Sequence, residues 1–224
     1  GSLASQGVSV TACMDLADLL LCVPEQAPEG AAARLAAVRA AWQALAATAP
    51  AGLGLVLLPR QMACLWWAFP QTPPGLCAAL CAADWLDPGL RRQVEQGWDC
   101  LVLDHYGSTE SAFAGAVQCR CREGRHVRAL DLLLEIVHPV TGKVLPAGET
   151  GELVITTLQR RAMPLLRYRT GDMASLLDGP CACGSPLPRL GPVLGRIEYA
   201  GQGFRVTHPR KGGSEERRSC TITL

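Results

Sequence analysis

Five side chains that can bind a metal ion gather in two short segments of the sequence. Four are thiols and one is an imidazole: Cys119, Cys121, His126, Cys181 and Cys183. Zinc in structural sites takes four such ligands in a tetrahedron. In "CACG" two thiols flank a single residue, and the glycine that follows permits a tight turn. Because so many potential ligands lie in two short segments, we favour a zinc site over unligated surface thiols.

A second group of polar residues, "HYGSTE", directly follows the apolar run "CLVLD". One interpretation is structural: a strand, a glycine turn, and a helix that Ser108 caps and whose first turn carries Glu110. The other interpretation is functional, because ligands of parallel sheets bind beyond the carboxyl ends of the strands. A further polar segment, "LLRYRTGDMASLL", places Arg167, Arg169, Thr170 and Asp172 around an expected turn. The two segments together favour a functional site.

Strands and helices are expected to alternate between residues 16 and 104. The strand candidates are "LADLLLCV", "GLGLVLL", "GLCAALCAA" and "CLVLD". The helix candidates are "EGAAARLAAVRAAWQALAATAP", "RQMACLWWAF" and "GLRRQVEQGW". Leu35, Val38 and Trp42 share one helix face, and Asp87 with Pro88 forms a helix start. This alternation predicts an α/β fold, in which a mostly parallel sheet has helices on its faces.

The pattern changes after the helix start that we expect near Ser108. The segments "LDLLLEIV", "HPVTGK", "VLPAGETG" and "ELVITTL" alternate strand-forming residues with turn residues. They predict a smaller antiparallel β subdomain that ends near Arg196. We therefore expect an α/β segment over residues 1–111, a β-rich subdomain with the zinc site over 112–196, and the remnant of a hinge with a polar tail over 197–224.

Composition argues against two classes of partner. The formal net charge is +1 and the basic residues are dispersed, so neither nucleic acid nor an acidic membrane is favoured. A zinc-ribbon nucleic-acid binder is disfavoured for the same reason. The chain has no long apolar run and no secretory signal, which predicts a cytoplasmic protein. Several thiols lie in apolar runs, as buried reduced thiols do: Cys22, Cys64, Cys77, Cys81 and Cys100.

Four motifs occur together in the order and approximate spacing of the adenylate-forming acyl-CoA ligases. They are Tyr106 to Glu110, Gly148 to Thr157, Tyr168 to Asp172, and Gly195 with Arg196. The segment most resembles the phenylacetate-CoA ligase branch, which carries similar "YG-x-TE", "GE-x-GELV-x-TTL", "P-L-x-RYRT-x-D" and "GR" motifs. Any one motif is weak evidence, whereas four motifs in the same order and approximate spacing are specific for this family. The resemblance implies the central part of the N-terminal domain of such a ligase.

The resemblance also implies a reaction. A carboxylic acid attacks the α-phosphate of ATP to give an acyl-adenylate and pyrophosphate, and coenzyme A then displaces AMP to give a thioester. Charge builds on phosphoryl oxygens, so a metal ion and positioned donors do most of the work. By resemblance, the catalytic residues are Thr109, whose hydroxyl would meet the α-phosphate, and Glu110, which would bind Mg²⁺.

The nucleotide-binding residues are implied in the same way: Tyr106, Gly107, Ser108, Asp172 and Arg196. Tyr106 would lie against the adenine, and Asp172 would accept hydrogen bonds from the ribose hydroxyls. Arg196 would lie near the nucleotide, at the hinge to a C-terminal domain. Without the other motifs, Asp172 would be read as a turn residue and Arg196 as a solvated charge.

Some phenylacetate-CoA ligase relatives have a cysteine seven residues before a histidine, as Cys119 and His126 are here. This likeness favours Cys119, His126, Cys181 and Cys183 as the zinc ligands, with Cys121 left over. The role of the zinc ion would be structural, holding the β subdomain against the helix start near Ser108.

Two parts of the family pattern are not found. We see no phosphate-binding loop ahead of the matched region, and after Glu198 the resemblance fades before a C-terminal domain. We therefore expect a ligase segment truncated at both ends, which alone binds nucleotide weakly and turns over poorly. The expected substrate is a small, aryl carboxylic acid, and exposed apolar surface would favour a homodimer. The alternative is a zinc-stabilised, catalytically incompetent interaction module of the same fold.

Overall fold

The structure is a computed structural model, and it describes residues 36, 39–40, 42–44, 46–47, 52–69, 71–111, 114–200, 203–207 and 220–222. The chain divides into two compact units, Gly1–Asp104 and His105–Leu224. The strand expected at residues 16–23 lies outside the described residues. The described residues between 36 and 47 are helical, as expected. None of the described helices is long and apolar enough to cross a bilayer.

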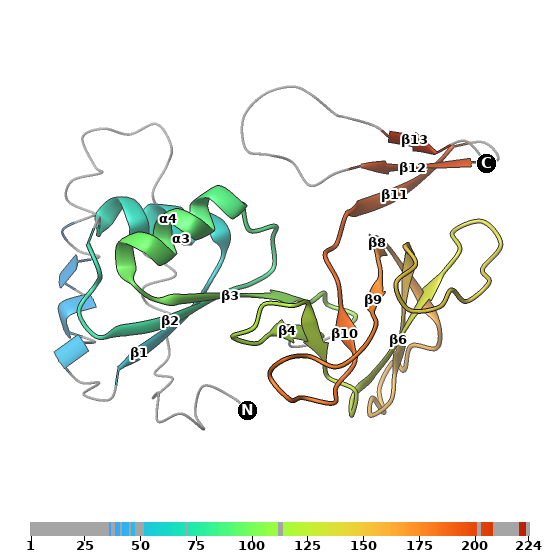
Figure 1. The fold of residues 1–224 in the computed structure, drawn as a ribbon, viewed down its shortest axis with the longest axis horizontal. Helices are drawn as coiled ribbons and strands as arrows, with labels where there is room; N and C mark the ends of the chain where they lie inside the picture. The colour runs from blue at the N-terminus through green and yellow to red at the C-terminus, as the bar shows by residue number, and fades with distance from the viewer. Residues whose placement is uncertain are drawn as a thin grey trace. The chain divides into compact units, whose positions relative to one another are not determined.

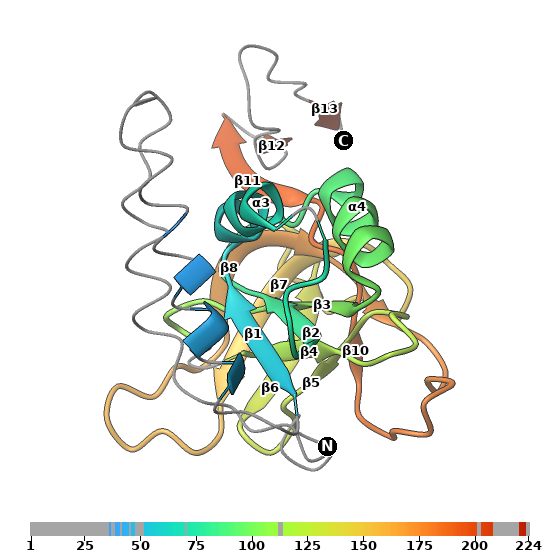
Figure 2. The same ribbon diagram turned by 90° about the vertical axis from the view of Figure 1, so that its left-hand side faces the viewer.

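The first unit contains parallel strands joined by helices. In chain order its elements are β1 (Leu53–Leu57), α3 (Pro59–Ala68), β2 (Leu76–Cys81), α4 (Pro88–Trp98) and β3 (Leu101–Tyr106). β1 pairs with β2 and β2 with β3, both in parallel. The two crossovers join neighbouring strands, and both helices lie on one face of these strands, as Figures 1 and 2 show. The expected α/β fold with its mostly parallel sheet is confirmed.

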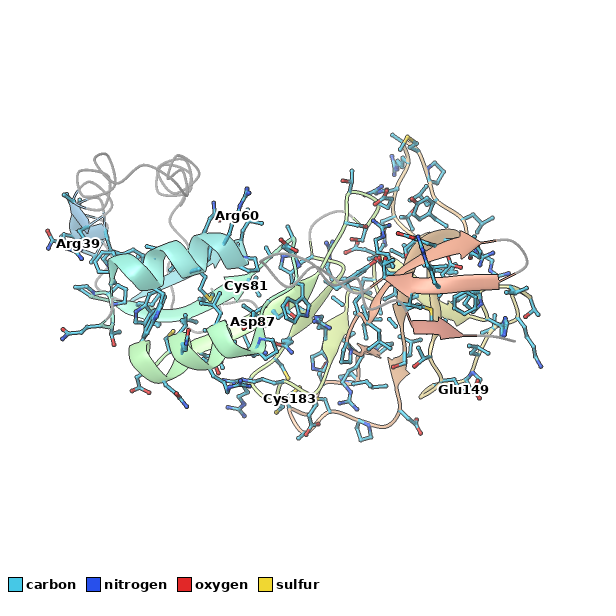
Figure 3. All side chains as sticks on the ribbon, turned by 90° about the horizontal axis from the view of Figure 1, so that it is seen from above. Arg39, Arg60, Cys81, Asp87, Glu149 and Cys183 are labelled. Atoms are coloured by element: carbon cyan, nitrogen blue, oxygen red, sulfur yellow. The ribbon has the colours of Figure 1, made fainter. Side chains whose placement is uncertain are left out.

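Local sequence signals explain the start of α4. The Asp87 carboxylate accepts hydrogen bonds from the backbone amides of Gly89 at 2.7 Å and Leu90 at 2.9 Å. Asp87, labelled in Figure 3, therefore caps the helix as predicted, with Pro88 in the first turn. The largest fully buried side chains of this unit fill the space between the helices and the strands: Trp42, Trp98, Met62, Leu65, Val94 and Val102.

The thiols of the first unit differ in burial. Cys81 and Cys100 are buried, and burial raises the pKa of the Cys81 thiol to about 12 and that of Cys100 to about 11. Cys77 is exposed, so the prediction that it is a buried thiol is wrong. The reason is the alternation of β2, which turns Leu76 and Ala78 inward and Cys77 outward. The side chains of Cys22 and Cys64 lie outside the described residues.

The second unit is antiparallel. Its strands are β4 (Ala116–Gln118), β5 (Arg125–Val127), β6 (Leu132–Val137), β7 (Gly151–Thr157), β8 (Tyr168–Ala174), β9 (Leu176–Leu177), β10 (Arg189–Leu190), β11 (Gly195–Ala200), β12 (Gly203–Thr207) and β13 (Cys220–Ile222). One sheet runs from the last two residues of β3 in the order β3-β4-β5-β10-β9, and the other has the order β13-β12-β11-β8-β7-β6. Apolar side chains from both sheets form a single buried cluster. The antiparallel subdomain predicted from the turn-rich segments is confirmed.

The larger sheet continues past Arg196. β11 pairs with β8 on one side and with β12 on the other. A small core of its own holds this hairpin, in which Met173 of β8 packs with Phe204 and Val206 of β12. The antiparallel part is therefore longer than the turn pattern of the sequence indicates.

The segment after β3 is a turn. The amide of Ser111 donates to the Ser108 carbonyl at 3.1 Å, and the amide of Ser108 donates to the Ser111 hydroxyl at 2.8 Å. Residues 109–111 form this turn, so the prediction of a helix that starts at Ser108 is wrong. The two serine side chains bind the nearby backbone groups, which is how serine competes with helix formation.

Candidate nucleotide-binding site and metal centre

Asp172 lies in a strand, where the sequence had indicated a turn. In the pairing of β7 with β8, Glu152 faces Met173 while Val154 faces Arg169, so β8 carries extra residues at this point. Gly171 adopts a positive φ of 78° in this bulge. Bulges re-aim side chains next to functional sites. Here the bulge sets the direction of the Asp172 side chain, because Asp172 directly follows Gly171.

Three predicted site residues meet at the Asp172 carboxylate. The Tyr106 hydroxyl donates to Oδ2 at 2.7 Å, and Nε of Arg196 lies 3.2 Å from Oδ1. The Asp172 side chain is 15% exposed and that of Arg196 is 70% exposed. Burial, and then the Asp172 carboxylate, raise the pKa of Tyr106 well above its ordinary value. A carboxylate has about four acceptor positions, so two contacts leave room for further hydroxyl donors.

Glu110 lies against the same strand. The Tyr168 hydroxyl, from the start of β8, donates to Oε1 of Glu110 at 3.3 Å. Hydrogen bonds from its own backbone amide and from the Ser108 hydroxyl hold the pKa of Glu110 below its usual range. An ionised carboxylate at the edge of this turn has the chemistry of a Mg²⁺ ligand.

The other predicted residues lie in the connecting turn. Thr109 is exposed, and its carbonyl accepts a hydrogen bond from Arg160 at 3.1 Å. A Cβ added to Gly107 would lie 3.3 Å from Cε1 of His105, so this position leaves little space for a larger residue. Ser108 contacts Ser111. The structure thus brings Tyr106, Glu110, Asp172 and Arg196 to one strand, β8.

Two contact residues of this site were not assigned from the sequence. Tyr168 holds Glu110, and Arg160 holds the turn at Thr109. Tyr168 does stand in the "RYRT" motif, which is the signal that could have identified it. Arg160 belongs to the basic pair "RR" and carries no such signal.

The second site is the cluster of thiols and imidazole, and it contains the four residues predicted as zinc ligands. The ligand atoms of Cys119, His126, Cys181 and Cys183 all lie within 4.8 Å of one another. The Cys119 and Cys181 sulfurs are 3.7 Å apart, and the Cys183 sulfur lies 3.3 Å from Nε2 of His126. Tetrahedral zinc with ordinary bond lengths separates two sulfurs by about 3.8 Å and a sulfur from a nitrogen by about 3.5 Å. The donor set and its spacing fit zinc.

Local structure positions these ligands. Cys119 follows β4 and His126 lies in β5, while Cys181 and Cys183 lie in the loop between β9 and β10. Gly184 has a positive φ of 81°, and its amide donates to the Cys181 carbonyl at 2.9 Å, which closes the tight turn expected at "CACG". The backbone amide of Cys183, labelled in Figure 3, lowers the pKa of the Cys181 thiol.

The cluster links the β4–β5 hairpin to the β9–β10 loop. The expectation that it holds the β subdomain against a helix start is therefore wrong, because residues 109–111 form a turn and the four ligands come from β segments. Cys121 lies in the β4–β5 turn and is not a member of the four-residue group.

Arg189 organises the loop that carries two of these ligands. Its side chain is 7% exposed, and it donates to the carbonyls of Asp178 and Gly179 at 2.9 and 3.1 Å and of Glu123 at 2.9 Å. A buried guanidinium that holds several carbonyls is costly to remove, because each acceptor then loses its partner.

We expect Arg189→Met to lower the free energy of unfolding by about 2–4 kcal/mol, measured by denaturant unfolding of the metal-free protein. The control is Arg205→Met. Arg205 pairs with Glu198 where both side chains are nearly half exposed, and such pairs contribute about 0–1 kcal/mol. Equal stability of the two variants would contradict the organising role of Arg189.

Comparison with known proteins shows sequence similarity to curated ligases. No family model matches the chain. A phenylacetate-coenzyme A ligase from Thermus thermophilus is 42% identical over 124 residues, which cover 54% of this chain and 27% of that protein. Over this segment the sequence of the chain is similar to that of a phenylacetate-coenzyme A ligase. A phenylacetate-coenzyme A ligase from Pseudomonas putida is 41% identical over 119 residues, covering 52% of this chain and 26% of that protein. The chain thus spans about a quarter of the length of these two curated proteins.

Solved structures share the fold of this chain. An open conformation of 2-hydroxyisobutyryl-CoA ligase, in complex with 2-HIB-AMP and CoA, gives a TM-score of 0.65 at 18% identity, covering 76% of this chain and 42% of that one. ATP-bound MatB from Rhodopseudomonas palustris gives a TM-score of 0.53 at 16% identity, covering 75% of this chain and 36% of that one. At these identities the likeness is one of fold.

Proposed function

We propose that this chain forms part of an AMP-forming acid–thiol ligase that activates a carboxylic acid with ATP and transfers the acyl group to coenzyme A. The observation that carries the proposal is the meeting of Tyr106, Asp172 and Arg196 at β8, with Glu110 held on the same strand by Tyr168. These residues stand in motifs resembling those of the phenylacetate-CoA ligases, and a ligase of that name is 42% identical.

In this proposal each residue has a role that suits its chemistry. The Asp172 carboxylate accepts hydrogen bonds from the ribose hydroxyls, using the positions that Tyr106 and Arg196 leave open. Tyr106 lies against the adenine, and the turn with Gly107 and Ser108 brings Thr109 to the α-phosphate. Bound Mg²⁺ would neutralise phosphoryl oxygens. Glu110 would hold it as a carboxylate ligand, and Tyr168 orients that carboxylate.

The proposed reaction has two steps, formation of an acyl-adenylate and formation of a thioester. A carboxylate oxygen of the acid forms a bond to the α-phosphorus of ATP, and pyrophosphate leaves. The coenzyme A sulfur then attacks the carbonyl carbon of the acyl-adenylate, and AMP leaves. In this proposal Arg196, whose side chain is 70% exposed, meets the charge that develops on the nucleotide. We propose an aryl acid as the substrate, on the ground of the likeness to phenylacetate-CoA ligases.

We also propose a structural zinc ion bound by Cys119, His126, Cys181 and Cys183. Four soft or borderline donors in a tetrahedral arrangement match the preference of zinc, and a closed four-ligand site adds folding energy. Unpaired thiols persist most readily in a reducing compartment, so we propose a cytoplasmic location for the protein. The homodimer expected from the sequence stays a prediction.

The second candidate function is a zinc-stabilised interaction module that lacks catalysis. The four-residue metal cluster favours it independently of the nucleotide site, because the two sites share no ligand. The two candidates differ in one measurable property, the binding of nucleotide.

The testing experiment is zinc analysis combined with a thermal-shift titration of the chain with AMP, ATP and Mg²⁺. We expect one zinc ion per chain and a rise in Tm with AMP, since a ligand at 100 times its Kd stabilises the folded state by about 2.7 kcal/mol. Stoichiometric zinc with no response to any nucleotide up to millimolar concentration would instead establish the interaction module. Pyrophosphate release by this chain alone is expected to be slow.

A further inference from the structure

Glu152 is a buried carboxylate to which the proposed reaction gives no role. It lies in β7 and is 2% exposed. A buried charge is costly unless it is paired and hydrogen-bonded. Oε1 accepts a hydrogen bond from the amide of Gly171 at 3.2 Å, and Oε2 accepts from Nε of Arg169 at 2.7 Å and from the Tyr199 hydroxyl at 2.9 Å. One carboxylate therefore contacts both β8 and β11.

The Gly171 contact holds the bulge that carries Asp172. Backbone groups in a bulge lose their place in the ladder of strand hydrogen bonds and need other partners. Here the amide of Gly171 donates to Glu152, and the amide of Asp172 donates to the Thr170 hydroxyl at 3.0 Å. The Thr170 hydroxyl in turn donates to the Leu153 carbonyl at 2.8 Å. The side chains of Glu152 and Thr170 thus hold the backbone of the bulge at Gly171 and Asp172.

The Tyr199 contact holds the strand that carries Arg196. Tyr199 and Arg196 both belong to β11, and Arg196 faces Asp172 in the pairing of β11 with β8. The Arg169 guanidinium lies 5.7 Å from the centre of the Tyr199 ring and donates to its hydroxyl at 2.6 Å. Arg169 also donates to Oε2 of Glu152. The same buried carboxylate therefore anchors both strands that supply nucleotide-binding side chains.

We propose that Glu152 is a positioning residue for the nucleotide site: it holds the Gly171 bulge and the Tyr199 strand so that Asp172 and Arg196 meet at one point. This inference rests on the proposed function of Asp172 as the ribose-binding carboxylate. In this proposal Glu152 acts through the backbone of β8 and β11 and not by direct contact with the nucleotide.

The test is Glu152→Gln in this chain, with two measurements. The first is the hydrogen-exchange rate of the Gly171 amide by NMR, and the second is the Kd for AMP. The variant keeps the volume of the side chain but loses its charge, which weakens charge-assisted hydrogen bonds. We expect the Gly171 amide to exchange about tenfold faster and the affinity for AMP to fall about tenfold.

The matched control is Glu135→Gln. Glu135 lies in β6 and pairs with Arg167 at 3.2 Å, so the same charge is removed from a neighbouring strand. Both measurements should stay at their wild-type values in this control. If Glu152→Gln does not fold, Tyr199→Phe is the replacement test. This variant removes only the hydroxyl that donates to Glu152, and we expect it to lower the affinity for AMP about threefold.

A double-mutant cycle with Asp172→Asn separates positioning from a general structural role. If Glu152 acts through Asp172 and Arg196, adding Glu152→Gln to Asp172→Asn costs less AMP affinity than adding it to the wild type, because only the contribution of Arg196 remains to be lost. Additive losses, or wild-type exchange and affinity in Glu152→Gln, would overturn the inference while leaving the proposed function standing. A wild-type chain that binds zinc but no AMP would overturn the proposed function, and this inference with it.

Discussion

Cys181→Ser is expected to abolish stoichiometric zinc binding. Cys181 is buried, and its sulfur lies 3.7 Å from that of Cys119, as neighbouring ligands of one tetrahedral ion would. Serine retains the size of the side chain but offers a hydroxyl that is a poor zinc ligand at neutral pH. Loss of a hydrogen-bond partner of a ligand costs about 10–100-fold in metal affinity, so loss of a ligand itself should cost more, on the order of 10³-fold. Metal analysis after dialysis against a chelator measures this.

The same substitution should also destabilise the fold. Because the proposed zinc ion would hold the β4–β5 hairpin to the β9–β10 loop, its binding free energy would contribute directly to the folding free energy. A 10³-fold loss of affinity corresponds to about 4 kcal/mol, which thermal unfolding in the presence of zinc would detect.

Cys121→Ser is the matched control for zinc binding. Cys121 is a free thiol in the same "CRC" segment as Cys119 but is not a member of the four-residue cluster. We expect Cys121→Ser to retain one zinc ion per chain and wild-type stability. Zinc loss in Cys121→Ser, or full retention in Cys181→Ser, would show that the ligand set is wrong.

Asp172→Asn is expected to lower the affinity for AMP by about 100-fold. The carboxylate accepts from Tyr106 and lies next to Arg196, and the proposal adds two ribose hydroxyls as donors. Asparagine keeps the shape but has one acceptor oxygen and no charge. Two hydrogen bonds to a charged group contribute about 1.5–3 kcal/mol each, which converts to 100-fold or more. Titration of Tm or of heat with AMP measures the change.

The control for this prediction is Asp131→Asn. Asp131 pairs with Arg128, and both side chains are more than one-third exposed. The substitution removes the same charge from the same unit and should leave the Kd for AMP unchanged. Both variants should bind zinc as the wild type does. An Asp172→Asn variant with wild-type AMP affinity would remove the main support for a nucleotide site.

Local signals in the sequence were sufficient for much of the fold. The strands β1, β2 and β3, the helix α4 with its Asp87 cap, and the β6–β7 pair all occur where the sequence predicts them. These elements depend on hydrophobic periodicity, capping and turn residues, which act between residues close in the chain. The prediction failed at Ser108, where two serine side chains bind the backbone in a turn.

The sequence by itself also predicts the chemistry of the two candidate sites. The types of donor at Cys119, His126, Cys181 and Cys183 predict a zinc cluster, and the four motifs predict a nucleotide site that includes Glu110 and Asp172. Only the tertiary structure decided how these residues meet. It placed Asp172 in a bulge of β8, excluded Cys121 from the metal cluster, and gave Glu152 the anchoring contacts to Gly171 and Tyr199. The physical reason is that strand register and bulges arise from pairing between distant segments, and no local pattern encodes that pairing.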